Sequence, residues 1–319
     1  MKQASLKLNL TVKRTREQVF LEQMAQVVPW TVLVELIAPY YPGGKTGRPP
    51  FSLQTMLRVH FMQQWFTLSD PGMEEAFFDR PVYREFAQLE EFGRLPDEST
   101  ILRFRHRLEK HKLAEHVLGV ANDILIEHGL LLKLGTVVDA TLIAAPSSTK
   151  NTQHQHDPDM HSNKKGQQMY FGMKAHIGAA AESGVVLTVR GTSGIVSDVT
   201  EGNSLLHDQE TVTFGDTGYH GIQKRPDAKA DVTCHVAMRP GKRKALNNDN
   251  AADALIDKAE KIKAGIRAKV EHPFRVIKRQ FGIVKVRFRG FKKNTAQLVT
   301  LFALSNLWMV RGKLMEAQG

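Results

Sequence analysis

The sequence predicts an α/β fold in which a mixed β-sheet flanked by helices follows an all-helical N-terminal domain. Apolar residues recur at helical spacing through residues 1–128. From Leu134 the pattern changes to short apolar and β-branched runs that are typical of strands. These runs come in the order strands, helix, strand, strand and helix, which indicates a mixed layer fold and not a regular doubly wound sheet.

Length and charge point to two domains and a polyanionic partner. The chain has 319 residues, 42% of them hydrophobic, and a net charge of +11. Residues 1–128 carry 16 basic and 16 acidic side chains, so the whole excess lies in residues 129–319. We therefore expect a neutral helical domain over 1–128, and a basic domain over 129–319 that binds nucleic acid.

Cysteine content and hydropathy exclude other classes of protein. Cys234 is the only cysteine, so a disulfide framework and a CxxC zinc site are excluded. The N-terminus leads into polar residues, and the apolar stretch from Leu298 to Val310 is too short to span a bilayer. We expect a cytoplasmic protein without a membrane partner.

The N-terminal domain is expected to consist of short helices with one candidate for DNA recognition. The expected helices cover residues 17–30, 52–66, 72–78, 82–88, 96–110 and 114–128, the last ending at Gly129. In the helix over 96–110, Arg103, Arg105 and Arg107 lie largely off the apolar stripe. This pattern fits the recognition helix of a helix-turn-helix unit or a solvated helix face, and the neutral charge of the domain leaves both open.

The second domain begins with a strand that is apolar on both faces. The expected strands cover 136–143, 173–179, 185–190, 211–215 and 233–237. Residues 146–168 form a polar loop, and residues 239–250 a basic one. Asp198 is expected to cap a helix that runs to about residue 207, and a long helix starts near Ala252, followed by C-terminal helices.

Three carboxylates are isolated from other acidic residues. Asp139 follows the apolar run 136–138, and Asp216 follows the run 212–215. Glu271 is the only acid between Glu260 and Glu316, a window that holds fourteen Lys and Arg. Oxygen-only ligand sets select Mg²⁺ or Mn²⁺, and two such ions roughly 3.5–4 Å apart can hold both oxygens of a phosphoryl displacement. The three acids therefore predict a site for two metal ions that acts on phosphates.

The segment around Glu271 adds cations suited to DNA phosphates. Arg267, Arg275 and Lys278 share a helical face with Glu271, and Pro273 should kink this helix. Arg279 follows directly, and Lys285 and Arg287 alternate with apolar residues in a segment expected to be extended and to follow a DNA backbone.

Several ordered segments resemble the insertion-sequence-five family of DDE transposases. The resemblance covers nearly the whole chain and is carried by residues 47–50, 95–108, 135–150, 171–178, 216–221 and 267–282. It implies an RNase H-like catalytic domain in which Asp139, Asp216 and Glu271 bind two Mg²⁺. Arg267 and Lys278 match the Arg and Lys that flank the family's glutamate, as contacts to the terminal inverted repeats.

The sequence departs from the family pattern at two positions. Ala264 stands where the wider signature has a tyrosine, and Ser197 stands where a histidine commonly precedes the aspartate matched by Asp198. Any role of that tyrosine therefore has no bearer in this chain.

The function that the resemblance implies is DNA transposition. The enzyme would cut the ends of an insertion sequence and join the 3′-hydroxyl to target DNA, acting on double-stranded DNA as at least a homodimer. The helical domain over 1–128 would contribute DNA-end binding or dimerisation. An RNase H-like nuclease that cuts without joining and an inactive DNA-binding descendant of a transposase remain the alternatives.

Overall fold

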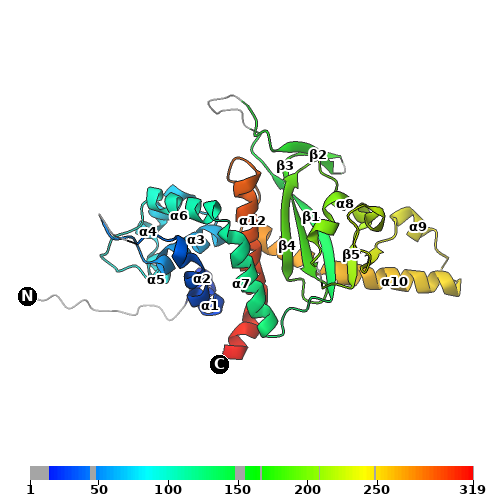
Figure 1. Cartoon of the computed structure of the whole chain (residues 1–319), viewed down its shortest axis with the longest axis horizontal. Helices are drawn as coiled ribbons and strands as arrows, with labels where there is room; N and C mark the ends of the chain where they lie inside the picture. The colour runs from blue at the N-terminus through cyan, green and yellow to red at the C-terminus, as the bar shows by residue number, and fades with distance from the viewer. Residues whose placement is uncertain are drawn as a thin grey trace, which may run out of the picture.

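A long C-terminal helix lies between a helical half and a sheet in this computed structural model, which describes residues 14–43, 48–147, 155–165, 167–207, 209–247 and 249–318. The N-terminal helices lie on one side of helices α7 and α12, and the β-sheet lies on the other (Figure 1). This arrangement confirms the α/β fold with a helical N-terminal part.

The N-terminal half consists of short helices, several of which begin with a side-chain cap. They are α1 (Arg16–Val27), α2 (Trp30–Ile37) with a 3₁₀ turn η1 (Ala38–Tyr40), α3 (Leu53–Trp65), α4 (Asp70–Asp79), α5 (Pro81–Phe86), α6 (Glu98–Lys110) and α7 (Leu113–Glu127). Thr15, Ser52, Ser69 and Asp97 each accept a hydrogen bond from a backbone N–H in the first turn that follows. Gly129 has φ +65° just after α7, as expected of a glycine that ends a helix.

The sheet is mixed and has β1 at its centre. Its strands are β1 (Gly135–Ala144), β2 (His161–Lys165), β3 (Gln168–Ala180), β4 (Val186–Ser193), β5 (Val212–Gly215) and β6 (Thr233–Val236). β1 pairs antiparallel with β3 and parallel with β5, which in turn pairs parallel with β6. β3 pairs antiparallel with both β2 and β4. The antiparallel strands β1, β3 and β4, extended by the short β2, are followed by the parallel strands β5 and β6. This order fits an RNase H-like sheet and confirms the expected fold class.

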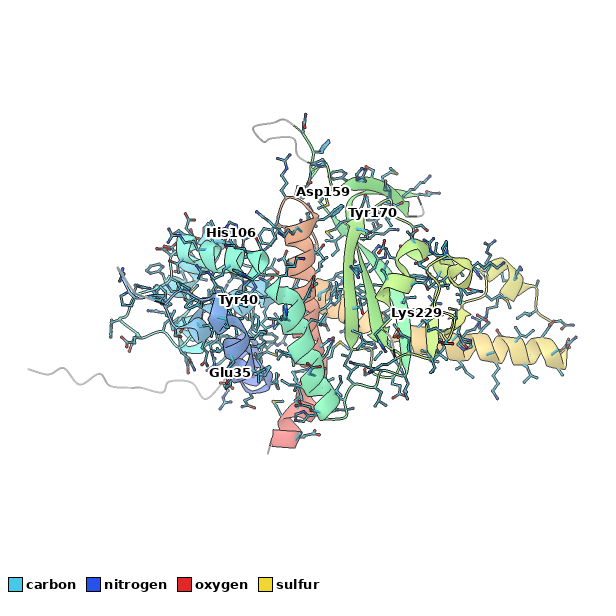
Figure 2. All side chains as sticks on the ribbon, viewed as in Figure 1. Glu35, Tyr40, His106, Asp159, Tyr170 and Lys229 are labelled. Atoms are coloured by element: carbon cyan, nitrogen blue, oxygen red, sulfur yellow. The ribbon has the colours of Figure 1, made fainter. Side chains whose placement is uncertain are left out.

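Helix α12 (Phe291–Gln318) joins the two halves. Leu301, Phe302 and Leu304 are fully buried, because the helix packs on α7 and α1 on one side and on β4 on the other. Its first backbone N–H groups are capped from the polar loop, where Asp159 accepts from Phe291 N at 3.0 Å (Figure 2). One apolar cluster therefore continues across residue 128, where composition suggested a boundary between domains.

Two buried asparagines fasten this junction. Asn306 of α12 accepts a hydrogen bond from Val186 N and donates to Val186 O, each at 2.8 Å. It also donates to Asn122 of α7 at 2.8 Å, and Asn122 donates to Val186 O at 3.1 Å. Helices α7 and α12 are thereby tied to the edge of β4 through hydrogen bonds that water does not reach.

Several elements differ from the expectation. The helix expected over 198–207 is only α8 (Asp198–Glu201) with a 3₁₀ turn η2 (Asn203–Leu205). The polar loop contains β2, and the basic loop contains the short helix α9 (Pro240–Lys244). The parts of the polar loop at 148–154 and 166 lie outside the described residues.

The segment around Glu271 is interrupted. α10 (Ala251–Ala268) ends before Lys269, α11 (Glu271–Arg275) restarts the helix, and a π-helix η5 (Val276–Gln280) follows. Pro273 lacks an N–H and clashes with the carbonyl four residues earlier, which is that of Lys269 in the interruption. The kink expected from Pro273 is therefore confirmed, and the expectation of one continuous helix is wrong.

Within the described residues, no single helix has the length and apolar content needed to cross a membrane. The segments Arg16–Val27 and Trp30–Tyr40, bent by 68° at their junction, pass the same test only as a pair.

Candidate active site

Asp139 and Asp216 lie on neighbouring parallel strands. The last paired residues of β1 and β5 are Val137 and Phe214. Asp139 lies two residues beyond Val137, and Asp216 lies two residues beyond Phe214. Because parallel strands run in the same direction at equal rise, this register brings the two carboxylates side by side.

Local hydrogen bonds orient both carboxylates. Oδ1 of Asp139 accepts from Ala140 N at 2.8 Å, and Oδ1 of Asp216 accepts from Gly218 N at 2.7 Å. The second bond caps the 3₁₀ turn η3 (Thr217–Tyr219). A Cβ on Gly218 would lie 2.9 Å from Oδ1 of Asp216, so the turn closes at this distance only with glycine. The Asp-Thr-Gly-Tyr motif thus holds Asp216 rigidly.

Burial and neighbouring charge act on the Asp139 carboxyl. Burial raises its pKa to about 6, opposed by the hydrogen bond from Ala140 and supported by the charge of Asp216. The charge of Arg267 opposes the rise, and that of Asp198 adds to it. Burial and nearby negative charge disfavour the ionised form of this carboxyl, and such a shift is characteristic of a site that binds a cation.

We expect Asp139→Asn to stabilise the metal-free protein at pH 7. Because the pKa of Asp139 is higher in the folded state than in the unfolded state, ionisation of this carboxyl lowers the free energy of unfolding. This destabilisation is fully present above pH 6 and disappears as pH falls below the unfolded pKa. The free energy of unfolding of Asp139→Asn should exceed that of wild type by about 1 to 3 kcal/mol at pH 7. Urea unfolding in EDTA measures this difference. Asp123→Asn on the surface is the control. An equal gain at pH 7 and at pH 3.5 would contradict the assignment.

Asp198 lies close to this pair, although the sequence suggested a helix cap. Ser197 occupies the cap position, and Asp198 is the first residue of α8. Its Oδ1 accepts from Lys174 Nζ at 2.9 Å. Its Oδ2 lies 3.6 Å from the position of a Cβ on Gly218, close to Asp216. The interpretation of Asp198 as a helix cap is therefore wrong. The polar residues Lys174 and His176 within the apolar strand β3 were the sequence signal for the place of Asp198 beside the site.

The Tyr219 hydroxyl is the second feature that sequence reasoning missed. The side chain is 1% exposed, and its hydroxyl has no hydrogen-bond partner among the described residues. Burial raises the pKa of Tyr219, as do, in order, the charges of Asp139, Asp198 and Asp216. A buried donor among carboxylates can hold a carboxylate oxygen or a water molecule there.

Glu271 is the third carboxylate of the predicted metal site. It is the first residue of α11 and is exposed. Within the described residues, no three His, Cys, Asp or Glu side chains are placed to hold a metal ion together. Arg267, one helical turn earlier in the sequence, does act on the charge of Asp139. The structure brings Asp139 and Asp216 together. The role of Glu271 as a metal ligand stays a prediction.

The donors present suit a hard divalent cation. Asp139 and Asp216 offer carboxylate oxygens on neighbouring strands, with the buried Tyr219 hydroxyl beside them. Mg²⁺ and Mn²⁺ take such oxygen ligands, and the remaining positions are left to water and phosphate.

The cations expected to contact DNA fall into two groups. Arg275, Arg279 and Lys285 are exposed and Arg267 is half-buried. Lys278 donates to Leu142 O at 3.0 Å, so it anchors the π-helix on the end of β1. Arg287 donates to Leu68 O at 2.7 Å, and burial lowers its pKa. Arg287 therefore joins the extended segment to the N-terminal half, and its part as a DNA contact stays a prediction.

Arg105 also has an internal role. It is buried, and its two terminal nitrogens lie 2.9 Å from Asp70 Oδ2 and 2.8 Å from Glu109 Oε1. Its guanidinium also lies over the Phe288 ring, 4.3 Å from the centroid. Arg103 and Arg107, which flank it in α6, face the opposite side, where Arg103 is exposed. The assignment of Arg105 to DNA is therefore wrong.

We expect Arg105→Ala to destabilise the protein without changing how DNA affinity depends on salt. The change leaves two poorly solvated carboxylates without their counter-ion, which should cost about 2 to 3 kcal/mol. Urea unfolding measures the loss, and Arg103→Ala removes the same charge from the exposed face as the control. Equal unfolding curves for the two variants would contradict the internal role.

Two family models match this chain. The model described as "Transposase domain (DUF772)" matches residues 9–107. The model described as "Transposase DDE domain" matches residues 131–307, which is more than half of the chain and includes both site aspartates. The chain therefore belongs to the DDE transposase family, and its function is that of a DDE transposase.

One solved structure shows a more distant similarity. It is a cryo-EM structure of a piggyBac transposase synaptic complex with hairpin DNA. The match has a TM-score of 0.44 and 10% sequence identity, and it covers 96% of this chain and 78% of that chain.

Proposed function

We propose that this protein is the transposase of an insertion sequence of the insertion-sequence-five family. It cuts at terminal inverted repeats and joins the exposed 3′-hydroxyl to target DNA. The observation that carries the proposal is the pair Asp139 and Asp216 on adjacent strands, beside the charge of Arg267 and within the matched DDE region.

Asp139, Asp216 and Glu271 would hold two divalent cations, Mg²⁺ or Mn²⁺. When bound, the cations lower the pKa of water or of a 3′-hydroxyl and neutralise charge on the phosphate that reacts. Asp139 contributes a carboxylate from the middle of the central strand, where its position is rigid. Glu271 would join the aspartates from α11, which begins directly after the helix break at 269–270.

Other residues of the chain position these groups. Lys278 holds the segment after Glu271 against β1. Lys174 neutralises Asp198 and so limits repulsion among the carboxylates. The Tyr219 hydroxyl supplies a donor where the carboxylates meet.

The partner is double-stranded DNA, at both the element end and the target. Exposed Arg275, Arg279 and Lys285 supply phosphate contacts close to Glu271. Joining two ends requires two active sites, so we propose a homodimer on DNA. We place the reaction in the cytoplasm, at the nucleoid.

The test uses a labelled inverted-repeat end and a target plasmid, with either Mg²⁺ or EDTA. We expect joined products with Mg²⁺ and none with EDTA. Products that are cut and never joined would replace the proposal by a nuclease. Binding to a verified cognate end without any cutting would replace it by a DNA-binding descendant.

A further inference from the structure

Helix α10 packs a charged face on its own chain. Asp257 pairs with Arg243 of α9 at 2.9 Å. Glu260 is buried, and its Oε2 accepts from Met238 N at 2.9 Å. The carboxylates of this face are therefore satisfied inside the protomer, and this is the side by which α10 is held.

A second face of α10 is apolar and exposed. Leu255, Ala259, Ile262 and Ile266 recur at intervals of four, three and four residues, the spacing of a helix that packs along another helix. Leu255 is nevertheless 68% exposed and Ile262 58%. We call these four residues the α10 stripe. Apolar side chains exposed in a row at this spacing are characteristic of a surface that another protein element covers.

The N-terminal helices of the same protomer do not cover the α10 stripe. Helix α10 extends beyond the sheet, on the side away from the N-terminal helices, and α12 lies between the two (Figure 1). An element from the helical half can therefore reach the stripe only from a second molecule.

The charges on α10 decide which kind of element fits. The charged side chains of α10 that are exposed are Lys258 and Lys261, and both are basic. The whole stretch 239–269 carries nine basic and four acidic residues. Two α10 helices packed on each other would bring these lysines together, and like charges across an interface disfavour it. The element that covers the stripe should therefore be acidic.

Helix α4 has the complementary surface. Glu75, Phe78 and Asp79 lie at i, i+3 and i+4 on one exposed face, and Phe78 is 65% exposed. Both exposed charges of α4 are thus acidic, and residues 70–98 carry nine acidic and three basic side chains. In the described part of the chain neither Glu75 nor Asp79 forms an ion pair, whereas Glu17 pairs with Arg80.

The position of Asp79 is not explained by the stability of α4 itself. Asp79 is the last residue of α4, where the helix dipole disfavours a negative charge. An aromatic side chain between two carboxylates is instead suited to an apolar stripe bordered by lysines, because an aromatic residue in the centre of an interface contributes strongly to binding.

We propose that α10 of one protomer docks on α4 of a second copy of this chain, an assignment that rests on the homodimer of the proposed function. Phe78 packs on the α10 stripe, and Lys258 and Lys261 lie against Glu75 and Asp79. The contact is made twice about a twofold axis, because each protomer carries both surfaces. Helix α10 leads through the break at 269–270 into Glu271, so docking also holds the segment that carries the third predicted carboxylate.

The test measures dimerisation of the full-length protein by sedimentation equilibrium, without DNA, in EDTA and at low and high salt. Wild type should form a dimer that weakens as salt rises. K258E/K261E and E75K/D79K should each raise the dissociation constant at least about tenfold. An equimolar mixture of the two variants should recover the wild-type affinity, because both contacts of the mixed dimer then join opposite charges.

Two control variants match these changes. K292E/K293E reverses two exposed lysines at the start of α12 and changes the net charge by the same amount as K258E/K261E. D123K/E127K reverses two exposed acids at the same spacing as Glu75 and Asp79, on α7. Both controls should dimerise as wild type does, and urea unfolding checks that every variant is folded.

Each outcome decides the assignment. A wild type that stays monomeric, or a mixture that does not recover, would overturn the contact. Normal dimerisation of E75K/D79K would exclude α4 as the partner surface, and equal losses in the controls would reduce the effect to net charge. Cutting of a labelled end is measured separately. A wild type that forms this dimer but neither binds nor cuts a verified end would uphold the contact and overturn the proposed function.

Discussion

Glu271→Gln is expected to abolish cleavage while DNA binding stays at the wild-type level or becomes stronger. The amide keeps the shape of the side chain but loses the negative charge that a divalent cation requires. The rate of cutting should fall by at least about a hundredfold, as for other groups that stabilise charge in a reaction. Cleavage of a labelled end in Mg²⁺ measures the rate, and anisotropy in EDTA measures binding.

Glu115→Gln is the matched control for this change, because Glu115 is exposed on α7 in the other part of the fold. The control should cut at the wild-type rate. Normal cutting together with weaker binding in Glu271→Gln would contradict the assigned role. It would instead make Glu271 a residue that only positions the basic segment.

Asn306→Ala is expected to cause the largest loss of stability. The change removes the partners of Val186 N and Asn122 inside the junction of α7, α12 and β4, where Asn306 is fully buried. Each buried polar group left without a partner costs about 1 to 3 kcal/mol, so the total should reach about 3 kcal/mol or more. Urea unfolding followed by circular dichroism measures the difference.

The control for this change is Asn247→Ala, because Asn247 is exposed. Because one core runs through both halves, the unfolding of Asn306→Ala should remain a single transition at lower urea. A loss below about 1 kcal/mol would contradict the role of the asparagine junction. Separate unfolding of the helical half and the sheet would contradict the shared core.

Local patterns in the sequence predicted most of the elements. The apolar run around Val137 gave the central strand, and Ser52, Pro96–Asp97 and Gly129 marked helix ends, because caps and period-two patterns act over a few residues. The isolation of Asp139 and Asp216 from other acids also picked out the pair that the sheet brings together.

The remaining features depend on contacts between distant residues. Nothing near Arg105 in the sequence shows that Asp70 and Glu109 enclose it, or that Arg287 reaches the carbonyl of Leu68. The pairing of Asp198 with Lys174 spans strand and helix in the same way. α12 was expected only as one of the C-terminal helices, and its central place follows from surfaces on α7 and β4 that no local pattern describes.

Asp139 and Asp216 together form the proposed catalytic centre for DNA strand transfer. Its most direct test compares strand transfer by wild type and Asp216→Asn on a labelled element end in Mg²⁺. Asp227→Asn serves as the control, because Asp227 is an exposed acid paired with Arg225 at 3.0 Å. We predict joined products for wild type and the control, and none for Asp216→Asn, which should still bind the end. Joined products at the wild-type level from Asp216→Asn would contradict the claim.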